Sequence, residues 1–315
     1  MATFLRDDVV RRLLPMDKAI EAVEAAFMEQ GVGTGVNRAR DRAQAGGTGV
    51  TMMVAALGGR GVAGFKAMGA GGPLVLLYGG EPRRLLAVME AAALGQIRTG
   101  AASGVAAKHM AREDAATIGV IGTGNQAETQ LSAVCAVRPI REVFAHSRTV
   151  ARREAFCGRM SEVLGIPVTP CDSAREAIVG RDIAIAITNV RTLEPVLFGE
   201  WVAPGALIIA AGANSLSRRE LDDDAVVRSA VVVADSREQA KLECADLVAP
   251  IARGLLNWER VWELGQVVTG QAPGRTSPND ITLFESQGIA LEDVAVAAHV
   301  FERAEVEGVG EPLPF

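Results

Sequence analysis

The chain has 315 residues, 49% of them hydrophobic and 22% charged, and a formal net charge of −6 at pH 7. This composition indicates a folded protein long enough for two domains, and it argues against a nucleic-acid-binding surface, which needs clustered Lys and Arg. The N-terminus reaches Arg6 and Asp7 before an apolar run can form, and no apolar stretch is long enough to cross a bilayer. We therefore expect neither a secretory signal nor contact with a membrane.

The cysteine and histidine content argues against a metal site. There are three histidines and four cysteines, and none of the cysteines form a C-x-x-C pair: Cys135, Cys157, Cys171 and Cys244. Such scattered cysteines are typical of buried free thiols in a reducing compartment. We expect a cytoplasmic protein without a metal.

Residues 1–112 have the pattern of one domain. An amphipathic helix comes first, with Ile20, Val23 and Phe27 on one face, and a Gly-rich stretch and the strand-like "LVLLYGG" follow. The small residues of "GQIRTGAASGVAAKHMARED" predict a helix packed closely against other backbone, and Thr99 is a candidate for its N-cap.

From residue 117 onward, short β-rich runs alternate with helical patterns. The runs are "TIGVIG", "REVFAH", "DIAIAIT", "ALIIAAG" and "AVVVADS". This alternation predicts a parallel sheet with helices on both faces. After it ends, "ALEDVAVAAHVFERAEVEG" has helical spacing, with Leu291, Val294, Ala298 and Phe301 on one face, so this helix could return to the first domain.

The stretch "ATIGVIGTGNQAETQ", residues 116–130, has the G-x-G-x-x-A spacing of a dinucleotide-binding turn. Gly122 permits a tight turn, Gly124 lets the backbone approach a pyrophosphate, and Ala127 allows close packing of helix on strand. We expect these residues, with the intervening Thr123, Asn125 and Gln126, to bind a dinucleotide. The alternative is a turn that binds nothing.

The next strand end predicts which dinucleotide is bound. NAD-binding folds place an acidic residue there, about 20 residues after the turn, but "REVFAHSRTVARRE" has none. The polar and basic residues that follow this strand are Ser147, Arg148, Thr149, Arg152 and Arg153. They suit the 2′-phosphate of NADP(H), unless the arginines form a solvated helix face. Thr188, at the end of "DIAIAIT", is also expected at the cofactor.

The chain resembles the ornithine cyclodeaminase/mu-crystallin family over nearly its whole length. The resemblance lies in "LGQIRTGAASGVAAKHMARED" leading into "IGVIGTGNQAETQL", in "SREQAKLECADL" and in "ITLFESQGIALEDVAVA". It implies an α/β protein in which a Rossmann NAD(P)-binding domain, residues 113–287, is inserted in a second α+β domain for substrate binding and dimerisation, residues 1–112 plus 288–315. It also implies a homodimer.

The resemblance points to three basic catalytic residues. Arg98 aligns with the family's substrate-carboxylate arginine, where bidentate pairing would fix the α-carbon, although it could instead bridge the domains. Arg40 occupies the region of a second family arginine, with Arg38 and Arg42 as competitors because Ala39 replaces the usual proline. Lys66 matches the family's active-site lysine, and its apolar surroundings favour a lowered pKa.

Position 214 is where the chain departs from the cyclodeaminases, which carry an aspartate there while this chain has Asn214. Asparagine cannot act as a general base, although it could simply be a turn residue. Asp235 is interpreted as structural or at the edge of the cofactor.

From these residues and the resemblance we expect an NADPH-dependent reductase of C=N bonds in small α-imino acids or cyclic ketimines, or a reversible amino-acid dehydrogenase. The alternatives are NAD-dependent cyclodeamination and a crystallin-like nucleotide-binding protein with little catalysis.

Overall fold

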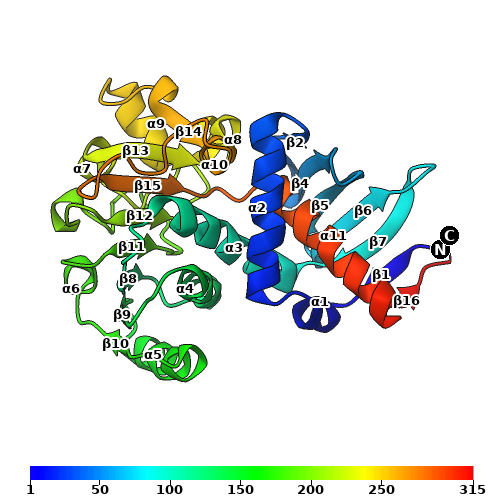
Figure 1. The fold of residues 1–315 in the computed structure, drawn as a ribbon, viewed down its shortest axis with the longest axis horizontal. Helices are drawn as coiled ribbons and strands as arrows, with labels where there is room; N and C mark the ends of the chain where they lie inside the picture. The colour runs from blue at the N-terminus through cyan, green and yellow to red at the C-terminus, as the bar shows by residue number, and fades with distance from the viewer. Residues whose placement is uncertain (315) are drawn as a thin grey trace.

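The computed structural model of the protein describes residues 1–314 and contains two sheets, which lie on either side of helix α2 (Met16–Val32) (Figure 1). The first sheet has the order β16-β1-β7-β6-β5-β4-β2, and β3 pairs with β4. Its strands are β1 (Thr3–Leu5), β2 (Gly35–Asn37), β3 (Asp41–Ala45), β4 (Thr48–Leu57), β5 (Val62–Gly69), β6 (Gly72–Gly79), β7 (Arg84–Glu90) and β16 (Glu311–Pro312).

The central strands of this sheet, β4 to β7, alternate buried with exposed side chains. Met53 is buried while its neighbours Met52 and Val54 are exposed, and Lys66 pairs across the strands with Met53 on one side and Val75 on the other. This period-2 pattern gives the sheet one core face and one outer face. Lys66 belongs to the core face, so the strand carries its ammonium group into the interior.

Helix α11 (Ala290–Glu307) covers the core face of the first sheet, as Figure 1 shows. Leu291, Val294 and Ala298 are buried on the expected stripe, and Phe301 packs against the core. The chain therefore returns after residue 288 to the sheet that it formed before residue 91. The other helices of this part are α1 (Asp7–Leu13) and α3 (Ala92–Met110).

The second sheet is entirely parallel and has the order β10-β9-β8-β11-β12-β15-β13-β14 (Figure 1). Its strands are β8 (Thr117–Ile121), β9 (Glu142–His146), β10 (Val168–Pro170), β11 (Ile183–Ala186), β12 (Leu207–Ala210), β13 (Ser229–Ala234), β14 (Val261–Glu263) and β15 (Ile281–Glu285). Its helices are α4 (Asn125–Val137), α5 (Val150–Leu164), α6 (Ala174–Ile178), α7 (Asp223–Val227), α8 (Arg237–Glu243), α9 (Ala245–Ala252) and α10 (Leu264–Val268). The strand order reverses between β8 and β11, and α/β sheets of this kind bind ligands at that crevice.

The predicted fold class, a Rossmann sheet combined with a second α+β unit, is confirmed by this architecture. Two details of the sequence interpretation are wrong. Thr99 is not an N-cap, because α3 begins at Ala92 and the Thr99 hydroxyl donates to the Gly95 carbonyl inside the helix. In addition, β15 lies between β12 and β13, although the sequence pattern had not indicated a strand there.

Helix α3 packs closely on α4, as its small residues predict. A Cβ atom at Gly100 would lie 2.4 Å from the Thr129 carbonyl oxygen of α4, so no side chain fits at this position. Close packing of this kind places the amino end of α3, which carries Gln96 and Arg98, beside the dinucleotide-binding turn.

Candidate functional site

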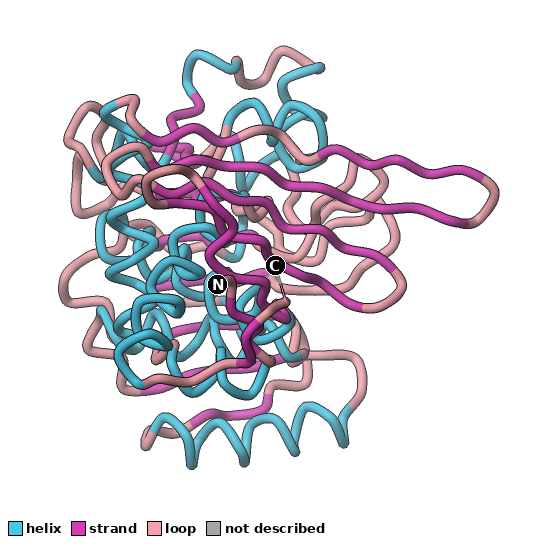
Figure 2. Tube along the Cα trace, turned by 90° about the vertical axis from the view of Figure 1, so that its right-hand side faces the viewer, coloured by secondary structure: helices cyan, strands magenta, loops and turns pink. Residues whose placement is uncertain are grey.

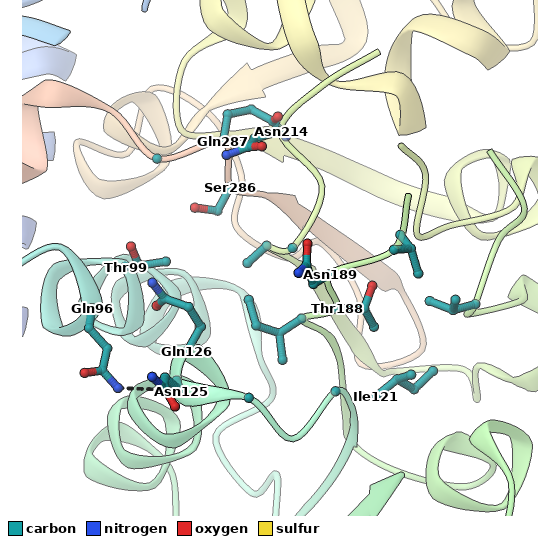
Figure 3. A pocket seen from close by; sticks show the side chains of 18 of the residues that line it. Gln96, Thr99, Ile121, Asn125, Gln126, Thr188, Asn189, Asn214, Ser286 and Gln287 are labelled. Atoms are coloured by element: carbon teal, nitrogen blue, oxygen red, sulfur yellow. Dashed lines mark hydrogen bonds between the residues drawn. The ribbon is translucent and has the colours of Figure 1, made fainter. Parts of the chain in front are cut away.

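One cavity of about 1330 Å³ lies between the core face of the first sheet and the carboxyl ends of the central strands of the second. Figure 3 shows its labelled residues coming from the amino end of α3, from the end of β8 and the start of α4, and from the loops after β11, β12 and β15. The predicted site residues line it, with the exceptions of Ala127 and Arg153. Ala127 is fully buried in the first turn of α4, the position that suits its predicted role in helix packing.

The turn between β8 and α4 has the geometry that a pyrophosphate needs. Gly122 has a φ of +109°, and a Cβ atom there would lie 2.2 Å from the Ile187 carbonyl oxygen, so only glycine fits. A Cβ atom at Gly124 would meet nothing within 4 Å, because this residue faces the open cavity. Helix α4 starts at Asn125, and its free N–H groups and positive end point toward an anion in this position.

Two glutamines of the cavity wall have buried polar atoms without a protein partner among residues 1–314. These atoms are Oε1 of Gln126 and both amide atoms of Gln287 (Figure 3). Buried polar groups are nearly always hydrogen-bonded, so unpaired ones in a cavity indicate a ligand that satisfies them. Together with the glycine turn, they show that the residues present fit a dinucleotide.

The carboxyl end of β9 presents hydroxyl and guanidinium groups to the same cavity. Ser147 and Thr149 line it, and the Ser147 hydroxyl hydrogen-bonds Thr123 Oγ1 at 2.7 Å. Arg148 and Arg152 are exposed at its rim and make no ion pair within the described chain. Arg153 is buried and directed away, since its guanidinium donates to Asp172 at 2.8 Å, so it does not belong to the 2′-phosphate group.

Lys66 lies on the cavity wall and is 5% exposed. Its Nζ donates to Asp293 Oδ1 at 3.1 Å, and glycine at position 95 leaves room for it, since a Cβ atom there would lie 2.8 Å from Nζ. Burial, together with the Arg98 charge, lowers the pKa of Lys66 below its usual range, although Asp293 opposes this shift. The ammonium is therefore poised to release a proton more readily than a surface lysine.

Arg98 is held by two carboxylates of helix α11. Its Nη1 donates to Glu292 Oε2 at 2.7 Å and its Nε donates to Asp293 Oδ1 at 3.0 Å, while Nη2 has no protein partner among the described residues. These contacts use the N–H of Nε and one N–H of Nη1. The N–H bonds of Nη2 and the second N–H of Nη1 remain for a ligand carboxylate.

The three candidate arginines of the β2–β3 segment lie in different positions relative to the cavity. Arg40 donates to Glu243 Oε1 at 2.7 Å and to the carbonyls of Gln287 and Gly288, both at 2.9 Å. Arg42 shares Glu243 and also lines the cavity, whereas Arg38 does not. Arg40 is thus anchored deep in the wall, and Arg42 is the more exposed of the two.

Asn214 lies at the cavity edge after β12, with its side chain exposed (Figure 3). Every described residue with a positive φ is a glycine, so Asn214 does not adopt the left-handed turn conformation. Its amide carries no titratable proton acceptor, so it cannot act as a general base. Thr188, on the neighbouring strand end, donates both its N–H and its hydroxyl to Glu220.

The cavity wall is strongly basic. Its charged side chains are Arg40, Arg42, Lys66, Arg98, Arg148 and Arg152, against a single carboxylate, Glu194. This balance favours anionic ligands such as a phosphorylated nucleotide and a carboxylate substrate.

The sequence interpretation missed the buried acids that support these bases. Glu292 and Asp293 are fully buried at the start of α11, and Glu243 lies beneath Arg40 and Arg42. Burial raises the pKa of Glu292 to about 8, whereas the Arg98 and Lys66 charges overcome burial and hold the pKa of Asp293 below its usual range. The pair "ED" inside an apolar helix was the one available signal, because such a helix rarely buries two acids without partners.

A glycine turn at the switch point of a parallel sheet, facing a basic cavity on a second unit, defines a dinucleotide-binding protein of the Rossmann class. The model of the ornithine cyclodeaminase/mu-crystallin family matches residues 2–308, and the chain belongs to this family, as the sequence resemblance predicts.

Named relatives span several reactions of the family. The chain is 41% identical over 237 residues to Delta(1)-pyrroline-2-carboxylate reductase of Bacillus cereus. This alignment covers 75% of this chain and 71% of the relative. The structure of Thermococcus litoralis Delta(1)-pyrroline-2-carboxylate reductase with NADH and L-proline is similar, with a TM-score of 0.91, 33% identity and coverage of 99% and 100% of the two chains. An archaeal alanine dehydrogenase dimer with bound NAD has the same TM-score of 0.91 and 33% identity, and covers 100% and 99%.

Proposed function

We propose that the protein is an NADPH-dependent reductase of the C=N bond in small α-imino acids or cyclic ketimines. The observation that carries this proposal is the pairing of Lys66 and Arg98 on one carboxylate, Asp293, at the wall that faces the glycine turn. A proton donor, an anion-binding cation and a dinucleotide-binding turn thus surround one cavity. Two of the relatives are named as reductases of a cyclic imino acid, which supports an oxidoreductase acting on C=N.

The proposed chemistry assigns separate roles to three cations. Arg98 Nη2 and Arg42 bind the substrate carboxylate, and the Lys66 ammonium donates a proton to the imine nitrogen. The reduced nicotinamide nucleotide, when bound, supplies the hydride that the imine carbon receives. The C=N double bond becomes a CH–NH single bond, and Lys66 regains its proton from solvent.

NADPH is the proposed nucleotide because Arg148 and Arg152 remain unpaired beside Ser147 at the end of β9. The solved relatives carry NADH and NAD, which supports a nicotinamide nucleotide, and the preference for the 2′-phosphate form is the part that we propose for this chain. Fluorescence titration tests it: NADPH binds more tightly than NADH, and Arg148→Ala narrows the difference. Equal affinities of the wild-type protein for NADPH and NADH would contradict the proposed preference for NADPH.

The proposed partner is a second copy of the chain, bound through the outer face of the first sheet. Figure 2 shows the strands of this sheet in front of the helices. Its outer face carries exposed or half-buried Val36, Val54, Phe65 and Tyr78 around a shallow cavity of about 340 Å³. Exposed apolar patches of this kind mark protein contacts, and a similar solved chain is described as a dimer.

We place the domain boundaries at residues 112/113 and 287/288. No helix of residues 1–314 is long and apolar enough to cross a membrane, and we propose a cytoplasmic enzyme.

Cyclodeamination is the second candidate, and Asn214 weighs against it because that cycle needs a base that an amide cannot supply. A panel of cyclic imines, and of keto acids with amines, tests the proposal by following oxidation of NADPH. Turnover with a cyclic imine supports the reductase, whereas no turnover with any member would favour a nucleotide-binding protein with little catalysis.

A further inference from the structure

Glu220 is a fully buried carboxylate that the proposed chemistry does not use. It lies beneath the loops that follow β11 and β12, where it accepts four hydrogen bonds. The donors are Thr188 N and Thr188 Oγ1, both at 2.6 Å, Gly212 N at 2.7 Å and Ala213 N at 3.2 Å. One side chain therefore ties two strand ends together.

The loops that follow β8, β11 and β12 pack so closely at this point that Gly122 and Gly212 have no room for a side chain. A Cβ atom at Gly212 would lie 2.4 Å from Thr188 N and 2.5 Å from Glu220 Oε1. On the other side, a Cβ atom at Gly122 would lie 2.2 Å from the Ile187 carbonyl oxygen. The dinucleotide turn, the β11 loop and the β12 loop thus form a continuous backbone wall, with Glu220 behind it.

Glu220 is itself held in place from below. Asp246 Oδ1 accepts from Glu220 N at 3.0 Å and from Leu221 N at 2.9 Å. Burial raises the pKa of Glu220, but three of its four donors are backbone N–H groups that can only donate, and these favour the ionised carboxylate. Such a supported, charge-assisted set of hydrogen bonds fixes its loops more firmly than neutral contacts would.

We infer that Glu220 is a positioning residue that holds the wall against which the nicotinamide half of the dinucleotide lies. This inference rests on the proposed function. The adenosine half belongs at the end of β9, near Arg148, and the pyrophosphate belongs at Gly122 to Gln126. The nicotinamide half then reaches the loops after β11 and β12, where Thr188, Asn189 and Asn214 line the cavity (Figure 3).

Binding measurements with two probes test this assignment. NADPH contacts both halves of the site, whereas 2′-phospho-ADP-ribose lacks the nicotinamide. Glu220→Gln keeps the side-chain size but turns one acceptor oxygen into an NH₂ group that faces N–H donors. We expect the Kd of NADPH to rise about tenfold, as loss of a charge-assisted hydrogen bond predicts, while the Kd of 2′-phospho-ADP-ribose stays within about twofold.

Asp182→Asn is the matched control, because Asp182 makes a similar set of hydrogen bonds at the opposite end of the sheet. Its Oδ2 accepts from Ala116 N at 2.9 Å, Thr117 N at 3.0 Å and Thr117 Oγ1 at 2.9 Å. We expect this variant to lower the Tm without changing the ratio of the two Kd values. A general loss of stability would therefore not reproduce the selective effect of Glu220→Gln.

The outcomes distinguish a failure of the Glu220 inference from a failure of the proposed reductase function. If wild-type protein binds neither NADPH nor NADH, the proposed function fails. If it binds NADPH and Glu220→Gln changes both Kd values together, or neither, the inference about Glu220 fails. Should Glu220→Gln not fold, Glu220→Asp keeps the charge on a shorter arm, and the same selective rise in the Kd of NADPH is required of it.

Discussion

Lys66 combines three features at the scale of a single residue: burial, one carboxylate partner and a glycine that leaves room for its ammonium. Its one hydrogen-bond partner among residues 1–314, Asp293 at 3.1 Å, leaves the remaining N–H bonds for the cavity. The missing Cβ atom at Gly95 allows Nζ its position. A buried lysine of this kind exchanges a proton more easily than an exposed one.

Replacing Lys66 with methionine tests its role directly. Lys66→Met keeps the apolar stem and removes the ammonium, so kcat/KM with the best imine should fall about 10²–10⁴-fold, the usual contribution of a general acid. The Kd of NADPH should change little. Lys108→Met, which removes an exposed ammonium paired with Glu24, is the control. Near-normal turnover by Lys66→Met would show that the lysine has no catalytic role.

The pH dependence of activity gives a second test at the residue scale. Burial and the neighbouring Arg98 and Arg40 charges lower the pKa of Lys66, and the Asp293 charge opposes them. Removing that charge with Asp293→Asn lowers the pKa further, so the protonated donor disappears at a lower pH. We expect the alkaline limb of the kcat profile to shift toward acid relative to wild type. A limb that stays in place means that another group donates the proton.

Individual residues also show what could be read from the sequence. Gly122 and Gly124 could be predicted at a ligand site because a buried strand precedes them and a helix follows, whereas Lys66 was predicted there by the family resemblance together with its apolar neighbours; all three line the cavity. Glu292 and Asp293 could not be placed there, because their partners are far away in the sequence. Asp293 is 195 residues from Arg98 and 227 residues from Lys66. Pairings over such distances depend on the tertiary fold.

Helix α11 is the element that connects the two ends of the chain. Its apolar stripe packs on β4 and β5 of the first sheet and on α2, and its first turn supplies the carboxylates for Lys66 and Arg98. The 3.6-residue period predicted this helix well. Strands β3 to β5 were harder to recognise from the sequence, because they contain glycines and polar residues. Their pairing with neighbouring strands specifies them instead.

Two substitutions in α11 measure the contribution of its buried stripe. Leu291 is fully buried, and Leu291→Ala should reduce the free energy of unfolding by about 2–5 kcal/mol because it leaves a cavity in the core. Val306 is 76% exposed in the same helix, so Val306→Ala should change it by less than about 0.5 kcal/mol. Denaturant titration of both variants checks this. Equal effects would contradict the packing of α11 on the first sheet.

At the scale of the whole molecule, the outer face of the first sheet determines the proposed assembly. Val54 is 42% exposed on that face and pairs across the strands with Phe65, which stacks on Tyr78 with ring centroids 6.3 Å apart. A homodimer would cover these side chains, whereas a monomer would leave them in water at a cost that scales with their area.

A charge in the middle of this face should prevent the assembly. Val54→Glu would place an unpaired carboxylate in the interface, so sedimentation should give a dimer for wild type and a monomer for the variant. Val163→Glu, on the exposed side of α5 at 65% exposure, is the matched control and should stay dimeric. A wild-type monomer at micromolar concentration would contradict the proposed partner.

The reaction itself is tested most directly by offering the purified enzyme Δ1-pyrroline-2-carboxylate with NADPH and, separately, ornithine with NAD. The basic cavity, with Lys66 as proton donor and Asn214 in place of an acidic base, predicts oxidation of NADPH with formation of proline in the first mixture. It also predicts no proline in the second, because the missing base removes a contribution of about 10²–10⁴-fold. Conversion of ornithine to proline, with no oxidation of NADPH by the cyclic imine, would contradict the account.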